Sequence, residues 1–254
     1  MTKELVNRVP HIILLYWVIK VASTTLGETG ADMFSMTYSF GYGETILIFM
    51  ALFAVLLGVK LSLRRYEPVT YWLTFTTTAI AGTAISDFID RSLGLGYAEG
   101  SALLVALLLV ILGLWYWRQR SINVEFITSG GAELYYWLAF LIANTLGTAA
   151  GDFVSDKIGL GFADGAMLFT GLLVIIALLH FFTRTSGVLL FWLAFVLTRP
   201  FGATFGDWLT KPLNHGGLDL GTVGASGLFM LILVLAVARE TYLEHTGRRI
   251  PEMD

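Results

Sequence analysis

Eight long apolar segments follow one another along the chain, separated by polar turns. They lie near residues 12–32, 44–63, 70–90, 99–117, 134–156, 164–182, 187–208 and 219–239. A helix needs about 20 residues to cross the roughly 30 Å of hydrocarbon in a bilayer, and each segment is close to that length. None of them has the alternating ten-residue pattern of a membrane β-barrel. The pattern therefore predicts an all-α, polytopic membrane protein with eight transmembrane helices.

An internal repeat groups these segments in pairs. A tryptophan precedes an aspartate by fifteen residues at four places, offset by 55, 65 and 55 residues: Trp17/Asp32, Trp72/Asp87, Trp137/Asp152 and Trp192/Asp207. Two spans per repeat give four tandem helical hairpins in one membrane domain, residues 1–254, with repeats at about 12–65, 69–120, 134–184 and 187–240. All four hairpins then enter the membrane in the same direction. A linker at 121–133 divides them into two halves of two repeats each.

Composition places the chain in lipid. Hydrophobic residues make up 56% of it and charged residues 14%, whereas a soluble domain has about 25% charged residues. The net charge of −3 argues against a nucleic-acid partner. Cysteine is absent, which excludes disulfides, Cys-ligated zinc and a thiol nucleophile.

The basic residues predict the orientation. Eleven of the 16 lysines and arginines lie near the two termini or in the loops after the second, fourth and sixth spans. Cytoplasmic segments are rich in lysine and arginine, so both termini are expected in the cytoplasm. The repeated aspartates are then expected at the outer end of the protein.

The odd and even spans differ in character. Even spans are nearly pure hydrocarbon, whereas odd spans are rich in small and polar residues. Pairs of small residues four positions apart let membrane helices approach closely. These pairs are Gly27/Ala31, Gly82/Ser86, Gly147/Gly151 and Gly202/Gly206. We therefore expect the odd helices to form an inner bundle and the even helices an outer ring.

Three charged residues lie deep in the odd spans. They are Lys20, Glu28 and Arg199, and the equivalent positions of the other repeats carry no charge. Charges inside a membrane are expensive and are therefore candidates for a functional role. One interpretation is an ion path lined by these three residues and Asn144, with Glu28 compensating Arg199 or Lys20. The alternative is a structural ion pair that fixes the register of the helices.

The outer carboxylates form a second candidate site. An acid at the C-terminal end of a helix is electrostatically unfavourable, so the repeated aspartates need another reason. Hard divalent cations prefer oxygen ligands, which makes these residues candidate metal ligands: Asp32, Asp87, Asp152 and Asp207. The second acid of each repeat is better explained as a helix cap that opposes the dipole of an even helix. These second acids are Glu44, Glu99, Asp164 and Asp219.

The repeated tryptophans are interpreted structurally. Each lies a few residues inside the cytoplasmic interface, where tryptophan anchors a helix at the bilayer surface or packs in the core. They are Trp17, Trp72, Trp137 and Trp192.

The repeat resembles a known family. YWLTFTTTAIAGTAISDFIDRSLGLGYAEG at 71–100 and YWLAFLIANTLGTAAGDFVSDKIGLGFADG at 136–165 carry its pattern best. They are similar to a bacterial family of integral membrane proteins built from four tandem two-helix repeats and of unknown function. The resemblance implies the eight-span fold and a location in the bacterial inner membrane. It brings no activity, cofactor or catalytic residue.

Three functions remain open at this point. The leading hypothesis is a transporter that moves a small inorganic or organic cation, with a divalent metal ion and proton coupling both considered. A second is a membrane enzyme that acts on a lipid or small molecule at the outer face, using an acid pair such as Asp152 and Asp156. A third is a sensor or assembly partner. The sequence favours a protein that is not an enzyme, with the bilayer and a bound cation as its partners, and leaves the oligomeric state open.

Overall fold

The computed structural model describes residues 7–122, 124 and 127–246, and the regular secondary structure of this part of the chain is all helical. Its eight α-helices are α1 (Leu14–Asp32), α2 (Gly41–Leu63), α3 (Pro68–Asp87), α4 (Gly96–Gln119), α5 (Gly130–Asp152), α6 (Gly161–Phe182), α7 (Gly187–Thr210) and α8 (Thr222–Thr246). The predicted all-α fold is confirmed. By length and composition, six of these helices can cross a membrane: α2, α4, α5, α6, α7 and α8. With 19 and 20 residues, α1 and α3 are long enough but carry more polar residues.

Short turns connect the two helices of each repeat. In the first three repeats a π-helical turn follows directly after the repeated aspartate, at Met33–Thr37, Phe88–Ser92 and Phe153–Lys157. The glycine nine residues after each aspartate has a φ between +76° and +79° in all four repeats. Residues with a Cβ rarely adopt this conformation, which explains the repeated glycine. These glycines are Gly41, Gly96, Gly161 and Gly216.

The four odd helices form a closed inner ring. Around it, α1 packs on α3, α3 on α5, α5 on α7 and α7 again on α1. The same glycine of each repeat lies at each of these contacts, where a Cβ would collide with the next helix. A Cβ added at Gly27 would lie 2.6 Å from the Cβ of Ala79. A Cβ added at Gly202 would lie 2.8 Å from the carbonyl carbon of Thr24. Gly82, Gly147, Gly151 and Gly206 are crowded by neighbouring inner helices in the same way. The predicted small-residue packing is therefore what brings these helices together.

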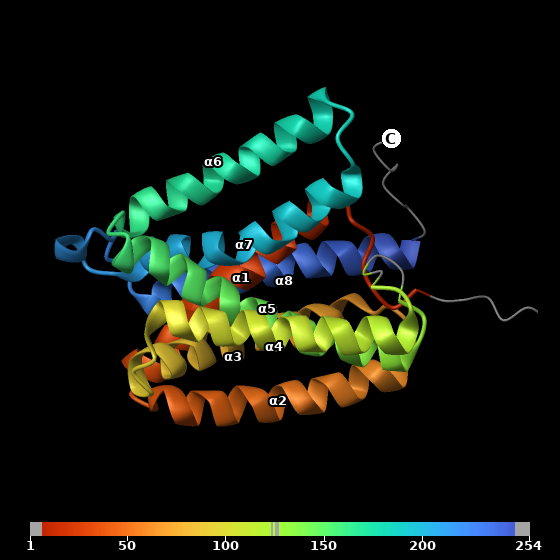
Figure 1. Cartoon of the computed structure of the whole chain (residues 1–254), viewed down its shortest axis with the longest axis horizontal. Helices are drawn as coiled ribbons and strands as arrows, with labels where there is room; N and C mark the ends of the chain where they lie inside the picture. The colour runs from red at the N-terminus through yellow and green to blue at the C-terminus, as the bar shows by residue number, and fades with distance from the viewer. Residues whose placement is uncertain (1–6, 123, 125–126, 247–254) are drawn as a thin grey trace, which may run out of the picture.

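The even helices lie outside this ring. In Figure 1, α6 and α2 lie at opposite edges of the molecule, with the odd helices between them. Between 17% and 28% of the most apolar window of each even helix is buried, against 61% for α5 and 50% for α7. The large side chains on the even helices are mostly exposed, as expected for a surface that faces lipid.

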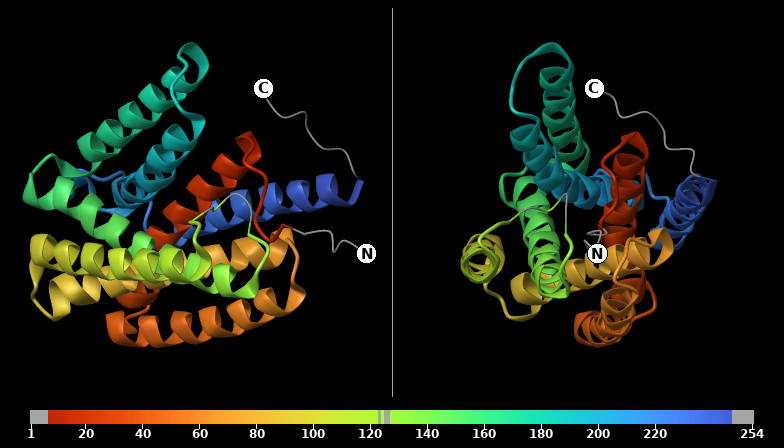
Figure 2. Two further views of the ribbon diagram at one scale, coloured as in Figure 1. Left: turned by 45° about the vertical axis from the view of Figure 1, so that its right-hand side comes forward. Right: turned by 90° about the vertical axis from the view of Figure 1, so that its right-hand side faces the viewer.

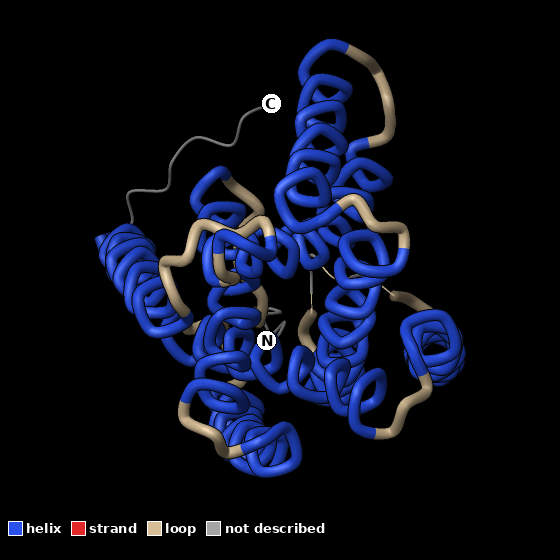
Figure 3. The backbone as a smooth tube through the Cα atoms, turned by 90° about the vertical axis from the view of Figure 1, so that its left-hand side faces the viewer, coloured by secondary structure: helices blue, strands red, loops and turns tan. Residues whose placement is uncertain are grey.

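Each even helix packs on the odd helix of the next repeat. Thus α2 packs on α3, α4 on α5 and α6 on α7, while α8 closes the cycle by packing on α1. The two helices of one repeat are therefore joined by a turn, but they pack mainly on helices of the adjacent repeats. The sequence predicted the hairpins and did not predict this packing. Figures 2 and 3 show this arrangement from other directions, including along the helices.

The molecule has two distinct ends. The start of α1 and the end of α8 lie at one end, called the terminal end below. Because every repeat has two helices, the four repeated aspartates lie at the opposite end, called the carboxylate end.

Candidate functional site

The inner helices stack their axial residues in layers. Positions four residues apart lie on one face of a helix, and the repeat places equivalent residues at the same height on all four helices. All of these residues except Phe191 are buried. From the terminal end the layers are Tyr16/Tyr71/Tyr136/Phe191, Lys20/Phe75/Phe140/Phe195, Thr24/Ala79/Asn144/Arg199, Glu28/Thr83/Thr148/Ala203 and Asp32/Asp87/Asp152/Asp207.

Lys20 lies in an aromatic cage. Its Nζ is 3.4 Å from the ring centroid of Phe195, 5.0 Å from that of Phe75 and 5.8 Å from that of Phe140. The cage consists of the three residues that replace lysine in the other repeats. Ring faces attract cations, and Lys20 makes no hydrogen bond or ion pair within the described part of the chain. The ammonium is therefore held by aromatic rings instead of a counter-ion.

Arg199 and Glu28 form an ion pair at the centre of the ring. Arg199 Nη1 lies 3.5 Å from Glu28 Oε2, with both side chains almost fully buried. Arg199 Nη2 donates to the hydroxyls of Thr83 and Thr148. Of the two basic residues that the sequence offered as partners for Glu28, Arg199 makes the contact. Asn144 instead donates to Thr78 at 3.0 Å.

The four aspartates are bridged in pairs by two basic residues. Lys211 Nζ lies 2.7 Å from Asp32 Oδ2 and 3.0 Å from Asp207 Oδ1. Burial opposes the charge on Lys211, but the Asp207 and Asp32 carboxylates outweigh it and raise the pKa of Lys211 above its ordinary value.

Arg91 bridges the other two aspartates, Asp87 and Asp152. Its Nε lies 3.3 Å from Asp87 Oδ1, and its Nη2 lies 4.0 Å from Asp152 Oδ2. The carboxylate layer is therefore not a free ring of four metal ligands, because two basic side chains already contact it.

Three carboxylates come close together here, two from the aspartate layer and Glu28 from the layer beneath it. Oxygens of Glu28, Asp152 and Asp207 all lie within 4.8 Å of one another, and all three residues are buried. Asp152 has the weakest partner, since it accepts no hydrogen bond from the described residues and its basic neighbour is 4.0 Å away. An oxygen-only donor set of this kind suits a hard cation or a shared proton.

The acid pair of the enzymatic alternative is divided between two environments. Asp152 is buried on the axis, whereas Asp156 is exposed and accepts a hydrogen bond from the Tyr97 hydroxyl at 2.8 Å.

The acids expected as caps lie at or just before the starts of the even helices, as predicted, but none makes a capping hydrogen bond among the described residues. Glu44, Glu99 and Asp164 are in the first turn of α2, α4 and α6, where they face the helix dipole but make no capping hydrogen bond. Asp219 precedes α8 with a φ of +57°. All four are exposed, so the capping interpretation holds only in its electrostatic form, for the first three.

Of the two roles expected for the repeated tryptophans, interface anchor or core residue, burial selects the core for two of the four. Trp72 and Trp137 are 1% and 0% exposed and pack in the core, so neither anchors the protein at a bilayer surface. Trp72 Nε1 also donates to Glu240 Oε2 at 2.6 Å. Trp17 and Trp192 are half-buried. Aromatic crowding around the odd helices, visible in the sequence as Tyr-Trp and Phe-Trp pairs, was the signal for core packing.

Glu133 is a buried charged residue that was not predicted from the sequence. It is buried at the start of α5 and lies 2.6 Å from Arg8 Nη1 and 3.1 Å from Lys60 Nζ. Lys60 also donates to the backbone carbonyls of Arg8 and Arg65. This cluster ties the segment before α1, the end of α2 and the start of α5 together at the terminal end. No repeated or periodic feature of the sequence marks it.

Comparison with known proteins agrees with the repeat. No curated protein and no solved structure matches the chain. A family model described as a repeat of unknown function, DUF347, matches four times, at residues 15–66, 70–121, 135–186 and 190–246. These matches cover most of the chain, and the protein therefore belongs to the DUF347 repeat family, with four tandem copies of the repeat.

Proposed function

We propose that this protein is an eight-span transporter of the bacterial inner membrane, with both termini in the cytoplasm, that moves a cation along the axis of its inner ring. The exposed apolar surfaces of the even helices support insertion in a bilayer. The polarity of α1 and α3 fits the same picture, because both helices are shielded by neighbours inside the ring.

The observation that carries the proposal is the buried group of Glu28, Asp152 and Asp207. One oxygen from each of the three lies within 4.8 Å of the other two. Like charges so close together are costly in a buried site unless a cation or proton lies between them. Three carboxylates brought together from three different helices are therefore well placed to bind the transported ion. Lys20, Asn144 and Arg199 line the deeper part of the route.

The charge balance of the axis narrows the choice of ligand by its charge. Five carboxylates, namely Glu28 and the four repeated aspartates, face the four basic side chains of Lys20, Arg91, Arg199 and Lys211. One negative charge is left over when all nine groups are ionised. A proton or a singly charged cation neutralises it, whereas a divalent ion leaves one positive charge in excess. The balance favours a singly charged ligand or an exchange of a divalent ion with protons.

The test combines binding and flux. Detergent-purified protein is screened by thermal shift with Na⁺, K⁺, Mg²⁺, Ca²⁺, Mn²⁺, Zn²⁺, Ni²⁺, small organic cations and pH. A ligand at 100 times its dissociation constant stabilises the folded state by about 2.7 kcal/mol. The cation that gives a shift is then followed into proteoliposomes.

Variants distinguish loss of the proposed binding site from loss of any negative charge. Asp152→Asn and Glu28→Gln are expected to abolish both the shift and the flux. Asp164→Asn, an exposed carboxylate of the same repeat as Asp152, serves as the matched control and is expected to retain both. Full flux in Asp152→Asn and Glu28→Gln, or no shift with any cation in wild type, would overturn the proposal.

A further inference from the structure

The charged residues that break the repeat lie on one interface of the inner ring. This interface, between α1 and α7, is called the α1–α7 seam. Lys20 contacts Phe195 across it at 3.4 Å. One turn further on, Arg199 and Glu28 meet across it at 3.5 Å, and at the carboxylate end Lys211 reaches Asp32 at 2.7 Å. The seam therefore has polar or charged contacts at several heights, including a hydrogen bond from the Thr24 hydroxyl to the carbonyl of Thr198.

The opposite interface, the α3–α5 seam, is fixed at both ends. At the terminal end the hydroxyls of Tyr71 and Tyr136 are 2.6 Å apart. At the carboxylate end Arg91 lies between Asp87 and Asp152. Two helices tied at both ends are expected to stay together, so this seam can hold the two halves of the ring while the opposite seam opens.

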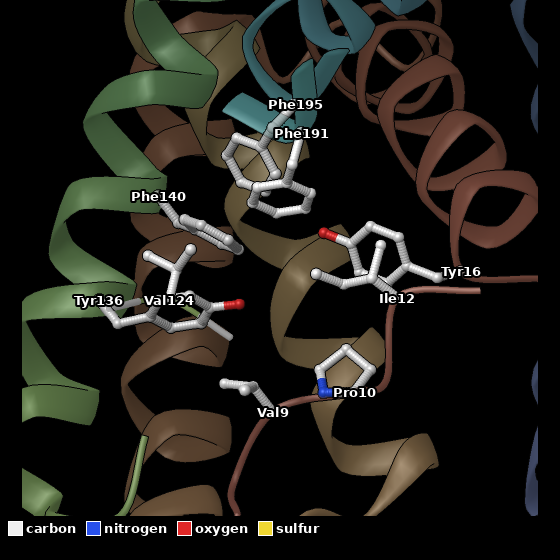
Figure 4. Close-up of a pocket in the computed structure, with 9 residues that line it drawn as sticks. All are labelled: Val9, Pro10, Ile12, Tyr16, Val124, Tyr136, Phe140, Phe191 and Phe195. Carbon is white, nitrogen blue, oxygen red and sulfur yellow. The ribbon is translucent and has the colours of Figure 1, made fainter. Parts of the chain in front are cut away.

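The terminal end of the α1–α7 seam contains a pocket instead of a tie. Tyr16, Phe191, Phe195, Tyr136 and Phe140 line it from three inner helices, and Figure 4 shows the hydroxyls of Tyr16 and Tyr136 pointing into it from opposite sides. Among the described residues, no ion pair or side-chain hydrogen bond joins α1 to α7 at this height. The seam is closed by charge at one end, whereas at the other end the described residues of α1 and α7 meet only through apolar and aromatic contacts around a small pocket, such as Trp17 with Phe191 at 5.8 Å between ring centroids.

We propose that the α1–α7 seam is the gate of the axial path, that Lys211 is the latch of this gate at the carboxylate end, and that the α3–α5 seam is the hinge. This inference rests on the proposed function, because it names the moving parts of the same route.

The position of Lys211 suits a latch. It follows the last residue of α7 on extended backbone and its side chain is 22% exposed, so it can leave the carboxylates without unfolding a helix. Asp207 belongs both to the latch and to the three-carboxylate group. A cation that binds this group competes with Lys211 for Asp207, which couples arrival of the ion to release of the latch.

The absence of cysteine makes the gate measurable. Thr83→Cys introduces one thiol on the axis, in the layer beneath the aspartates, with little change in volume. Its labelling by a membrane-impermeant thiol reagent is followed in membrane vesicles of both orientations. A separate Asp164→Cys reporter, at an exposed site, identifies the orientation in which the carboxylate end faces the reagent.

Lys211→Gln is expected to raise the labelling rate from the carboxylate end about tenfold, the effect of about 1.4 kcal/mol lost from the closed state. Arg91→Gln, on the hinge, and Lys157→Gln, an exposed lysine without an ion pair among the described residues, are expected to change it less than about twofold. Lys211→Arg keeps the charge and is expected to label slowly. If Lys211→Gln does not fold, Asp32→Asn breaks the same contact and carries the same expectation.

Two results would overturn the gate: no increase in Lys211→Gln, or an equal increase in Arg91→Gln. Labelling does not require transport, so the outcomes separate. Faster labelling without flux of any cation leaves the gate standing and refutes the proposed transport. Flux that depends on Asp152, with labelling unchanged in Lys211→Gln, supports the proposed transport and refutes the gate.

Discussion

Arg199 of α7 lies 3.5 Å from Glu28 of α1, and this ion pair is the only point at which opposite charges meet in the middle layers of the described axis. Its surroundings explain why both charges are tolerated. The guanidinium also donates to Thr83 and Thr148, so threonines of α3 and α5 contribute to the same site. One pair therefore links all four inner helices.

The pair is expected to be strongly coupled. Arg199→Gln leaves Glu28 buried without its counter-charge, and Glu28→Gln does the same to Arg199, so each single change is expected to cost about 3–5 kcal/mol of stability. The double variant leaves no unpaired charge and is expected to cost clearly less than the sum. A double-mutant cycle on thermal or denaturant unfolding in detergent measures the coupling. Additive losses would show that the two residues act independently.

Close helix contact in the ring gives the second prediction. At Gly27 a Cβ would lie 2.6 Å from Ala79 Cβ and 3.0 Å from its carbonyl carbon, so Gly27→Ala must push α1 and α3 apart. We expect it to destabilise the protein by about 1–3 kcal/mol, as overpacking of a tight contact does. Gly58→Ala on α2 is the control, because no atom lies within 4 Å of the added Cβ. It is expected to be neutral or slightly stabilising in the same melting assay.

The individual helices could be predicted from the sequence, but their neighbours could not. Periodic small residues such as Gly27 and Gly82 mark the face of a helix that packs closely, which is why the inner position of the odd helices was predictable. The same pattern says nothing about which helix lies opposite. The packing of α2 on α3, and of α8 on α1, depends on the crossing geometry of the whole ring.

The candidate site was predicted in part for the same reason. Glu28 and Arg199 were identifiable because a charge replaces an uncharged residue of the repeat. Lys211 and Arg91 lie just past the helices, where basic residues are common, so their bridging role became visible only when the aspartates were placed around one axis. The burial of Glu133 depends on contacts with distant segments and left no periodic trace.

The N-cap of α3 gives a pH-dependent prediction. Glu67 accepts hydrogen bonds from the backbone N–H groups of Val69 and Thr70, and from the Thr70 hydroxyl. Burial opposes its charge, but the hydrogen bonds from Thr70 and Val69 outweigh burial and lower the pKa of Glu67. Glu67→Ala is expected to cost about 1 kcal/mol at neutral pH.

The lowered pKa of Glu67 sets how its contribution to stability changes with pH. The contribution of Glu67 is complete above its unfolded pKa of about 4.3 and is lost as the pH falls through the lower folded value. The difference in melting temperature between wild type and Glu67→Ala should therefore be constant from pH 8 to pH 5 and shrink in stronger acid. Glu99→Ala, an exposed glutamate in the first turn of α4, is the control without a capping hydrogen bond. A difference that stays constant in acid would exclude an ionised cap.

Two buried lysines provide the last prediction, because they differ in what surrounds them. Lys60 is 0% exposed and contacts Glu133 and two backbone carbonyls, whereas Lys20 is 2% exposed and contacts only aromatic rings among the described residues. Lys60→Met leaves Glu133 with Arg8 alone and removes two hydrogen bonds, so it is expected to destabilise the protein by about 3 kcal/mol.

Lys20→Met removes a charge that ring faces stabilise by about 2 kcal/mol, against a desolvation cost of several kcal/mol. We therefore expect Lys20→Met to leave the melting temperature unchanged or raise it, while flux is lost. A residue that lowers stability yet remains in the core is retained for function, because packing alone favours the phenylalanine of the other three repeats. If Lys20→Met melts as early as Lys60→Met and its surviving folded fraction still transports, the lysine is structural and the aromatic cage is no part of the path.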